Sequence, residues 1–521
     1  MNHNFSLLRR VVLVCTLLFG LGLAAGCQHN EPLLPTQVPT AVSLTNNGLN
    51  RLPTPIPATH TPAPTIPPTN TPNYSPTPGP SPTMTATSTP TLVPTTTPTS
   101  APITIPTLPT DIAELIENIP TPATAVPTAV PTFETPKGTI NILLLGSDTP
   151  LGSAETRTDT MLIATINPDG PTASIISLPR DLFVYIPGWA MNRLNTALSH
   201  GEAKSFPGGG VELLKQTILY NFGIPIHYYA RVDFQGFQTI VDAIGGVEIA
   251  VSCEFKDWRL KSPELDIHDE DNWEIYTLEP GIYTMDGDAA LWYARARLFS
   301  SDFDRGRRQQ QLIQAIFNQG VDLGLVSQIP TLWNVYKDNV DTDLDIGRIL
   351  QLAAMAPAIR ENGIQHLYLA GKTVSWTTPN GADVQLPIWE GSGMMAETFS
   401  RLFMPPALSR AHRPPMYVEI VNATGNPDMT KLAADNLAWY GFVPVEGPTP
   451  PETVPTTELY YYGPNFKGSY DWLISWVFSL RKADIQLTQD ESYAYDYRVI
   501  LGEDYNPCRP QMYAPQLFLD Q

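Results

Sequence analysis

The sequence lacks the short motifs that define several large enzyme classes. It has no GxxxxGK[ST] phosphate-binding loop, no HExxH zinc motif, no GxSxG nucleophile motif and no paired CxxC motif. The sequence therefore gives no indication of a P-loop NTPase, an HExxH zinc peptidase, an α/β-hydrolase or a CxxC zinc module. Basic residues are also scarce, since 31 Lys and Arg stand against 51 Asp and Glu and give a formal net charge of −20. General nucleic-acid binding needs a broadly basic surface, so we expect no nucleic-acid partner, and any anion site must be local.

Cysteine is rare in this sequence. Four cysteines occur in 521 residues, and two of them, Cys15 and Cys27, fall in the N-terminal segment. The other two, Cys253 and Cys508, are far apart along the chain. Because exported proteins can carry disulfides, the sequence allows either a bridge between these two residues or two free thiols.

The N-terminus lacks an apolar run long enough for a typical membrane span. Arg9 and Arg10 precede an apolar run over 11–25, which suits a secretory signal but is shorter than the ~20 residues that a spanning helix needs. The run ends in "LAAGC", which resembles a bacterial lipoprotein signal with Cys27 as the lipidated residue. We therefore assign residues 1–27 to a signal or anchor; an uncleaved signal-anchor helix is the alternative. Both interpretations attach the protein to the cell membrane and place the rest of it on the extracytoplasmic face.

Proline and threonine are abundant in the next segment. Residues 28–136 hold about half of the 53 prolines. A segment of this composition cannot bury enough apolar surface to offset the entropy of ordering its backbone. We therefore predict a disordered Pro/Thr-rich linker over 28–136.

From Lys137 onward the pattern is that of a layered α/β domain. The runs "TINILLLGSD", "TMLIATINPDG" and "TASIISLPRD" predict three strands, the first buried on both faces and the last two joined by an Asn-Pro-Asp-Gly turn. Helices are predicted over 210–223 and 234–244, and a further helical stretch near 345–360. Alternating strands and helices favour an α/β domain over 137–410. A second β, α, β, α, β pattern predicts a smaller α/β domain over 415–508.

Five arginines crowd into "YARARLFSSDFDRGRRQQQ", residues 293–311: Arg295, Arg297, Arg305, Arg307 and Arg308. We expect a helix through "DGDAALWY", followed by an extended "ARAR" that points Arg295 and Arg297 the same way. A second helix is expected to begin near Arg305, capped by Asp302 or Asp304.

That second helix would show Arg305 and Arg308 on one surface, with Gln309 one turn beyond Arg305. The planar guanidinium group donates paired hydrogen bonds to phosphate oxygens, so converging arginines predict a ligand such as a pyrophosphate. An ion-paired surface, with Asp302 and Asp304 neutralising their neighbours, explains the same segment equally well.

Charged residues also follow the predicted strands. "SLPRD" places Arg180 and Asp181 at a strand exit, and rims of open α/β sheets are where ligands bind; a simple salt bridge is the alternative. Asp148 ends one strand and Asp159 begins the next. If these strands are neighbours, both carboxylates lie at one edge and suit Mg²⁺ beside a phosphate. Two turn caps are the plainer interpretation of the pair.

Together these segments resemble the LytR-CpsA-Psr (LCP) family of cell-wall phosphotransferases. The resemblance spans about 139–314, where the motifs occur in family order: "NILLLGSD", "RTDTMLIATINP", "SLPRD", "DFQGFQTIVDAIGGVEI", "MDGDAALWYARAR", "DFDR" and "RQQ". Residues 417–505 resemble the LytR-type C-terminal domain of many members. The resemblance implies an LCP-type central sheet flanked by helices, plus the smaller C-terminal α/β domain. Two departures are Asp304, where the family usually has a small residue, and a lipoprotein-type signal in place of a transmembrane anchor.

The resemblance also implies a reaction. Such enzymes move a glycopolymer from a polyprenyl-pyrophosphate carrier to peptidoglycan, which forms a phosphodiester and releases polyprenyl phosphate. The implied roles are Mg²⁺ binding by Asp148 and Asp159, proton acceptance by Asp159, a pyrophosphate grip by Arg180, Arg295 and Arg297, and further substrate contacts from Asp181, Asp302, Arg305 and Gln309. The prenyl chain is expected in an apolar slot between the sheet and helices 211–222 and 234–244. A lipid pyrophosphatase and a non-catalytic wall-binding lipoprotein are the alternatives.

Overall fold

The computed structural model describes six stretches of the chain, all within one compact unit: 126–151, 158–262, 264–388, 394–406, 415–466 and 470–509. The predicted signal with Cys27, and the linker as far as residue 125, lie outside the described residues. Within the described stretches, no helix combines the length and the apolar character needed to cross a bilayer.

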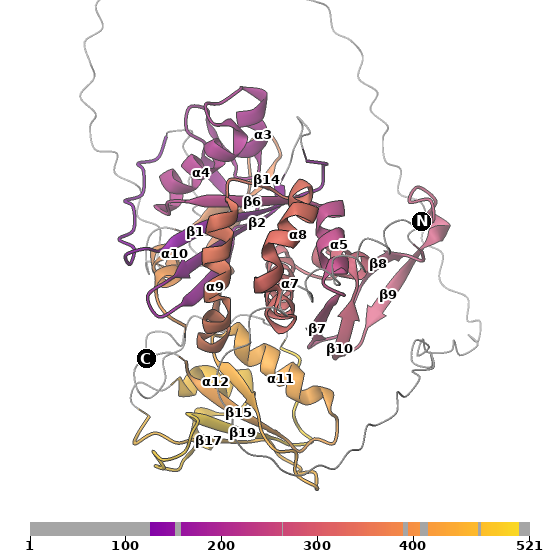
Figure 1. Ribbon diagram of the computed structural model, residues 1–521, viewed down its shortest axis with the longest axis vertical. Coiled ribbons are helices and arrows are strands. Elements are labelled where there is room, and N and C mark those ends of the chain that lie inside the picture. Colours follow the sequence, from indigo (N-terminus) through magenta and orange to yellow (C-terminus); the bar gives the residue numbers. More distant parts are fainter. Residues whose placement is uncertain are drawn as a thin grey trace, which may run out of the picture. The chain divides into compact units, whose positions relative to one another are not determined.

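A six-stranded mixed sheet lies at the centre of the first part of the described chain (Figure 1). Its order is β11-β6-β1-β2-β3-β12, with bounds β1 Ile140–Ser147, β2 Thr158–Asn167, β3 Thr172–Ser177, β6 Tyr228–Asp233, β11 Asp341–Thr342 and β12 Ile364–Leu367. The three strands predicted from apolar runs are confirmed as β1, β2 and β3, which pair antiparallel in sequence. β12 pairs parallel to β3 and was not predicted from the sequence.

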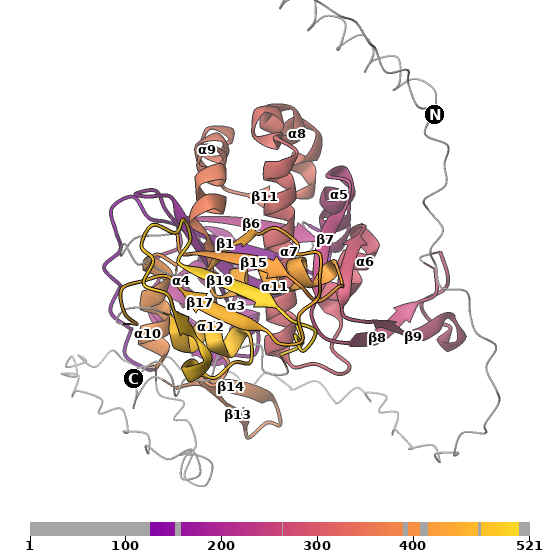
Figure 2. The ribbon, with the colours of Figure 1, turned by 90° about the horizontal axis from the view of Figure 1, so that it is seen from below.

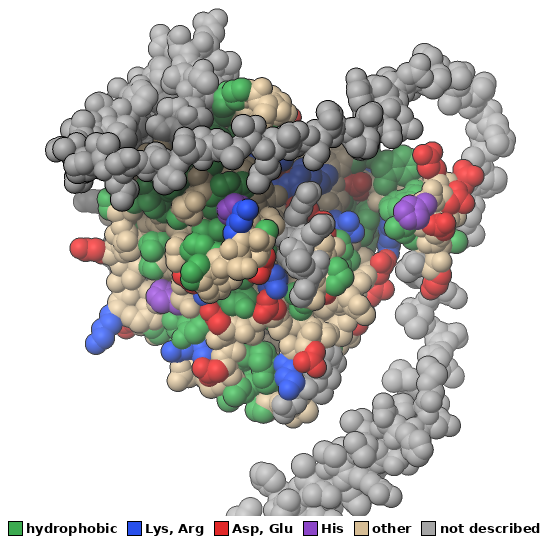
Figure 3. Space-filling view, turned by 90° about the horizontal axis from the view of Figure 1, so that it is seen from above, with side chains coloured by type: hydrophobic (Ala, Val, Ile, Leu, Met, Phe, Trp, Pro, Cys, Tyr) green, Lys and Arg blue, Asp and Glu red, His purple; other side chains and the backbone are tan. Residues whose placement is uncertain are grey.

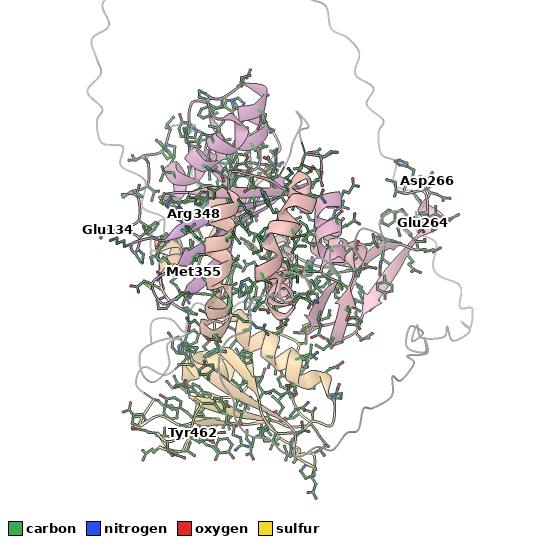
Figure 4. All side chains as sticks on the ribbon, in the orientation of Figure 1. Glu134, Glu264, Asp266, Arg348, Met355 and Tyr462 are labelled. Carbon is green, nitrogen blue, oxygen red and sulfur yellow. A yellow bond between two sulfur atoms is a disulfide. The ribbon has the colours of Figure 1, made fainter. Side chains whose placement is uncertain are left out.

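Helices cover both faces of this sheet. On one face Leu143 and Ile163 pack against α3 (Thr196–Ala203), α4 (Gly209–Phe222) and α10 (Met394–Ser400). On the other face Leu162 and Ile175 pack against α7 (Asp302–Asp322) and α9 (Ile346–Asn362); Figure 4 labels Met355, which contributes to this layer from α9. The prediction that the first strand is buried on both faces is confirmed, because Leu143 and Leu144 belong to opposite layers.

The layer between α4 and the sheet is densely packed. The inward residues of α4 are at most 1% exposed: Leu213, Leu214, Ile218 and Phe222. The helix ends where Gly223 adopts a left-handed conformation (φ 67°) that side chains other than glycine disfavour. This layer is the inner side of the region between the sheet and α4 in which the prenyl chain was expected, and that expectation stays a prediction.

A third cluster extends the sheet region on one side. α5 (Phe234–Ala243), α6 (Gly287–Arg295), β7 (Val247–Val251) and β10 (Gly281–Met285) pack together and against α7. From here β8 (Phe255–Leu260) and β9 (Trp273–Leu278) project as a two-stranded ribbon (Figure 1). The remaining short elements of this part are β4 Phe183–Tyr185, β5 Met191–Arg193, α8 Ile329–Tyr336, β13 Thr373–Thr377 and β14 Asp383–Pro387.

The tip of the β8–β9 ribbon carries acidic side chains, which Figure 3 shows as a red cluster. Glu264 and Asp266 lie there, exposed to solvent (Figure 4). Among the described residues, no three His, Cys, Asp or Glu side chains come together as a metal site would require. The stretch 266–274 is therefore a solvated acidic segment in this structure.

The C-terminal part forms its own five-stranded sheet and core (Figure 2). Its strand order is β16-β15-β19-β17-β18, with bounds β15 Tyr417–Asn422, α11 Asp428–Trp439, β16 Val443–Glu446, β17 Glu458–Tyr461, α12 Asp471–Val477, β18 Gln486–Leu487 and β19 Tyr497–Leu501. The five elements predicted from the sequence are present as β15, α11, β17, α12 and β19. Two short strands, β16 and β18, were not predicted.

Two long-range connections complete the fold. Cys253, after β7, and Cys508, after β19, form a disulfide, so the first of the two alternatives holds. In addition, the end of the predicted linker lies against α4, where the Val130 backbone N–H donates to the Tyr220 carbonyl (2.9 Å). The Phe133 ring packs beside Phe403. Order therefore begins before Lys137, because apolar side chains in the last residues of the linker find a surface to pack on.

Candidate active site

The ends of three central strands meet at one edge of the sheet. β1 and β3 both run antiparallel to β2, so their C-terminal ends lie beside the start of β2. Asp148 directly follows β1, and Arg180 lies three residues after β3. At the end of β1, Gly146 pairs with Thr160 and Ser147 pairs with Thr158, so Asp159 of β2 lies between the last two paired positions. Asp148 and Asp159 therefore lie at the same edge, on neighbouring strands.

The N-terminal turns of α7 close this edge into a small cavity. Its volume is about 30 Å³. The charged side chains that line it are Asp159, Arg180, Asp302, Asp304, Arg305 and Arg307. Gln309 and Gln310 also line it, and one wall comes from Trp439 of α11. Residues that are far apart in the sequence thus converge on one cavity.

Arg180 is held by two carboxylates. Its Nη1 donates to Asp159 Oδ1 at 2.8 Å, and its Nε donates to Asp181 Oδ2 at 3.3 Å. Arg193 of β5 approaches the other oxygen of Asp181 at 3.5 Å. Burial lowers the pKa of Arg180, but the hydrogen bonds and charges of Asp159 and Asp181 outweigh burial and raise the pKa above its ordinary value. Arg180 is therefore a fixed cation at the strand edge.

Arg305 is a buried cation with a weaker carboxylate contact. It is 7% exposed, and its closest carboxylate among the described residues is Asp302, at 3.6 Å. Burial is the largest effect that lowers the pKa of Arg305, and the charges of Arg297 and Arg180 lower it further. Asp302 opposes this shift. An arginine remains protonated despite such a shift, so the cavity contains a desolvated positive charge.

Arg297 and Arg295 differ in their surroundings. Arg297 Nη2 donates to Asp302 Oδ1 at 2.7 Å; Asp302 lines the cavity, whereas Arg297 itself is not among the described residues that do. Arg295 is exposed, and its guanidinium group stacks 4.2 Å from the centre of the Phe234 ring. Arg295 is not among the described residues that line the cavity. The expected extended "ARAR" is wrong in part, because α6 continues through Arg295 and only the second half of the segment, Ala296 and Arg297, lies outside the helix.

Arg308 does not share a surface with Arg305, contrary to the sequence prediction. It is 5% exposed and donates from Nε to the Tyr293 carbonyl at 2.9 Å and from Nη2 to the Ala296 carbonyl. Its guanidinium group also lies 4.7 Å from the centre of the Phe255 ring. The last carbonyls of a helix have no partner within the helix. Arg308 supplies that partner for α6, which is why it turns away from the cavity.

The start of α7 also differs from the prediction. Ser301 is the N-cap, and the helix begins at Asp302 rather than near Arg305. The Asp304 carboxylate accepts from the backbone N–H and hydroxyl of Ser301, at 2.9 Å and 2.7 Å. This reciprocal capping box occupies Asp304, whose charge therefore stabilises the helix start. Gln309 donates to the Ala294 carbonyl at 3.3 Å, and its side chain lines the cavity.

Several cavity residues were not singled out from the sequence. Gln310 is 1% exposed and donates to Ser177 Oγ (2.7 Å) and to the Leu367 carbonyl (2.9 Å). Gln310 belongs to the "RQQ" motif that the family resemblance included, but the sequence did not predict these hydrogen bonds. Arg307 was counted among the five arginines without a function. Trp439 had no signal in the sequence, because it belongs to the separate β, α, β, α, β pattern.

The profile of the LytR_cpsA_psr family matches residues 117–390, which is just over half of the chain. A relative from Oceanobacillus iheyensis, named polyisoprenyl-teichoic acid–peptidoglycan teichoic acid transferase TagU, is 34% identical over 228 residues, which is 43% of this chain and 65% of the relative. The corresponding transferase TagT of Bacillus subtilis is 31% identical over 214 residues, 40% of this chain and 59% of the relative. The chain thus spans less than two thirds of the length of both.

Among solved structures, that of B. subtilis TagV is similar at 23% identity, with a TM-score of 0.41. The match covers 51% of this chain and 96% of TagV.

Proposed function

Since the chain belongs to the LytR-CpsA-Psr family, we propose that it is a phosphotransferase that moves a glycopolymer from a polyprenyl-pyrophosphate carrier to peptidoglycan. Two relatives with more than 30% identity carry transferase names of this kind. The observation that carries the proposal is Arg305, a buried cation whose nearest described carboxylate is 3.6 Å away, in a cavity that Arg180 also lines. A pyrophosphate would supply anionic oxygens to which these arginines can donate paired hydrogen bonds.

In the proposed reaction, a sugar hydroxyl of peptidoglycan attacks the phosphorus on the glycan side of the pyrophosphate. The new P–O bond forms a phosphodiester, and the bridging P–O bond breaks. Polyprenyl phosphate leaves with the electron pair of that bond. The hydroxyl proton moves to a carboxylate, for which Asp159 is our candidate because it lines the cavity beside Arg180. Phosphoryl transfer depends mainly on positioning and on neutralising charge, and arginines serve both needs.

The existing ion pairs suit ligand exchange. The Arg180–Asp159 and Arg297–Asp302 pairs have side chains between 23% and 44% exposed. Pairs exposed to this degree contribute only ~0–1 kcal/mol to stability. A pyrophosphate can therefore replace a carboxylate as the partner of either arginine without a large loss elsewhere. Its oxygens would be bound by Arg180, Arg305 and Arg297. Asp302 would hold the guanidinium groups of Arg297 and Arg305 in place, and Gln309 would complete the set of groups around the ligand.

The donor set at the strand edge also fits Mg²⁺. Asp148 is exposed and directly follows β1, the strand that pairs with the strand of Asp159, and magnesium prefers one or two carboxylates plus substrate phosphates and water. We propose that Asp148 and Asp159 hold this ion. When bound, it would neutralise part of the pyrophosphate charge.

We further propose that the protein acts on the extracytoplasmic face of the membrane, attached through Cys27 or through an uncleaved signal helix. A lipid-linked substrate and a peptidoglycan acceptor both require this location. The mass of the mature N-terminus distinguishes the two modes of attachment.

The test uses the full chain in detergent, with Mg²⁺, a polyprenyl-pyrophosphate saccharide and peptidoglycan oligomers. A covalent glycan–peptidoglycan product supports transfer. Phosphate release that is independent of the acceptor indicates a pyrophosphatase, and binding without turnover indicates a wall-binding protein. Arg180→Ala should abolish the product, whereas Arg481→Ala is a matched control, because Arg481 is exposed and pairs with Asp484 on the same turn, and it is not among the described residues that line the cavity.

A further inference from the structure

The cavity of the proposed transferase is not built by the central sheet and its helices alone. One of its walls is the indole ring of Trp439, the last residue of α11 in the C-terminal part of the chain. Trp439 is 4% exposed, so nearly all of its surface is in contact with other side chains. The ring stacks on His366 of β12, with 4.6 Å between ring centres and 14° between planes. The position of Trp439 is therefore fixed by packing.

α11 is held against α7 by a matched set of polar contacts. Asp435, one turn before Trp439 and on the same face of α11, accepts from Arg307 Nη2 at 3.4 Å and from Gln311 Nε2 at 3.0 Å. Arg307 and Gln311 are likewise one turn apart, on α7. The Arg307 guanidinium group also lies 5.1 Å from the centre of the Trp439 ring. The two helices therefore meet through one face of each, beside the cavity.

His366 supports this arrangement as a neutral side chain. Burial, together with the charge of Arg307, lowers the pKa of His366 to about 3. Its Nδ1 lies 2.9 Å from Gln310 Oε1. An amide oxygen only accepts hydrogen bonds, so the imidazole proton is on Nδ1. A neutral ring stacked on Trp439 adds no second positive charge next to Arg307.

Two buried hydrogen-bond donors at this contact have no partner among the described residues. Arg307 Nε and Trp439 Nε1 are buried and make no hydrogen bond to any described residue. Both side chains line the cavity, and Arg307 is 6% exposed. Buried donors are normally paired, and exceptions point to a role or to a ligand. Both N–H groups suit the oxygen of a phosphate or of a sugar.

We propose that Arg307 and Trp439 form an inner subsite that binds an oxygen of the pyrophosphate-bearing substrate, so that the C-terminal part completes the substrate site. The ligand of this subsite is identified from the proposed function, on which this inference rests. Arg305 and Arg180 face the strand-edge side of the cavity, while Arg307 and Trp439 form the wall where α7 meets α11. The C-terminal part is then a source of substrate contacts, and its removal would leave the cavity open on that side.

The experiment measures binding and transfer separately, on the full chain in detergent. Farnesyl pyrophosphate is the binding probe in calorimetric titrations. Trp439→Phe keeps an aromatic ring on His366 and Arg307 but removes the N–H, and Arg307→Lys keeps the charge facing Asp435 but removes Nε. We expect each variant to raise the Kd of the probe about tenfold, as the loss of a hydrogen bond to a charged oxygen does. In the transfer assay, the KM of Trp439→Phe should rise by a similar factor while kcat is retained.

Trp476→Phe is the matched control. Trp476 packs on Tyr440 in the C-terminal core and is not among the described residues that line the cavity. Its Kd and KM should equal those of the wild type, with a melting temperature close to that of Trp439→Phe. Wild-type Kd values in both Trp439→Phe and Arg307→Lys would overturn the subsite, as would a wild-type protein that does not bind the probe. If these variants bind the probe more weakly but the protein shows no transfer, the subsite is supported and only the transferase proposal is contradicted.

Discussion

Arg308 donates its Nε–H to the carbonyl oxygen of Tyr293 at a distance of 2.9 Å. This bond crosses from α7 to the last turn of α6 and separates Arg308 from the neighbouring arginines of the cavity. Of the five arginines that are close in the sequence, Arg308 therefore stabilises the fold, while Arg305 and Arg307 line the cavity. The distinction can be tested with substitutions of matched size.

Arg308→Met should destabilise the protein. The carbonyls of Tyr293 and Ala296 would lose their buried partner, and a buried unsatisfied group costs about 1–3 kcal/mol. We expect the free energy of unfolding to fall by about 3 kcal/mol, as measured by urea denaturation. Arg305→Met is the comparison, because it removes a desolvated cation whose carboxylate partner is 3.6 Å away. Its stability should remain within about 1 kcal/mol of the wild type while transfer is lost. A stable Arg308→Met or an unfolded Arg305→Met would contradict this division.

Arg297→Ala should lower transfer without lowering stability. Its pair with Asp302 is 44% exposed on the arginine side, so the pair adds little to stability, whereas a contact to a phosphate oxygen is worth about 1.5–3 kcal/mol. We expect kcat/KM to fall roughly 10- to 100-fold at an unchanged melting temperature. Arg295→Ala should by contrast leave kcat/KM close to the wild-type value, because its guanidinium group stacks on the Phe234 ring and Arg295 is not among the described residues that line the cavity. A large drop in the melting temperature of either variant would show a structural role.

Asp148→Asn tests the proposed metal site. Removing one of two carboxylates should raise the Mg²⁺ concentration for half-maximal transfer about tenfold or more, and chelation of Mg²⁺ should abolish transfer reversibly. The transfer rate is measured against Mg²⁺ concentration. Glu264→Gln, on the distant ribbon tip, is the control and should leave the curve unchanged. Full activity in the presence of a chelator would exclude the metal.

The neutral state of His366 predicts a pH dependence of stability. Its pKa is about 3 in the folded protein and near 6.5 in an unfolded chain. Below about pH 6.5 the unfolded chain binds a proton that the folded protein excludes, so the stabilisation is complete above this pH and is lost as the pH falls toward 3, by about 1.4 kcal/mol per pH unit. Between pH 6.5 and 5 the wild type should therefore lose about 2 kcal/mol more than His366→Gln. Equal slopes in denaturation experiments across this range would disprove the buried neutral state.

The disulfide predicts a loss of stability on mutation. Replacing both Cys253 and Cys508 by Ser should lower the free energy of unfolding by about 2–4 kcal/mol, since the bridge restricts the unfolded chain. Mass spectrometry of peptides from the untreated protein should show the two cysteines linked. Peptides with both thiols free, or an unchanged stability of the double variant, would contradict the bridge.

Local patterns predicted most of the fold. The uninterrupted apolar run of β1 and the glycine that ends α4 at Gly223 are determined by nearby residues, so they can be recognised without tertiary contacts. β12 could not be recognised, because half of its four residues are the polar pair Gln365 and His366. Gln365 is buried beside Ser174 of β3, and His366 is buried between Gln310 and Trp439, which come from other elements.

The candidate site was predictable in outline for a related reason. Asp159, Arg180 and Arg305 occur in motifs that the family resemblance identified, and the fold brings them to one cavity. The helix that carries Arg308 was predicted. The direction of the Arg308 side chain was not, because it depends on carbonyl groups at the end of α6 that have no partner within that helix, and sequence spacing does not reveal them. Asp435 and Trp439 were not predicted, because their role depends on how α11 packs on α7, across 128 residues of sequence between Arg307 and Asp435.

The bond between Cys253 and Cys508, 255 residues apart, closes the intervening polypeptide into a covalent ring. A protease that cuts this ring once, at any position, produces two chain ends but no separate fragment. Both halves would stay in one molecule and run as one band on a gel until a reductant is added. A first cut would thus leave the arginine-lined cavity and its C-terminal wall covalently attached.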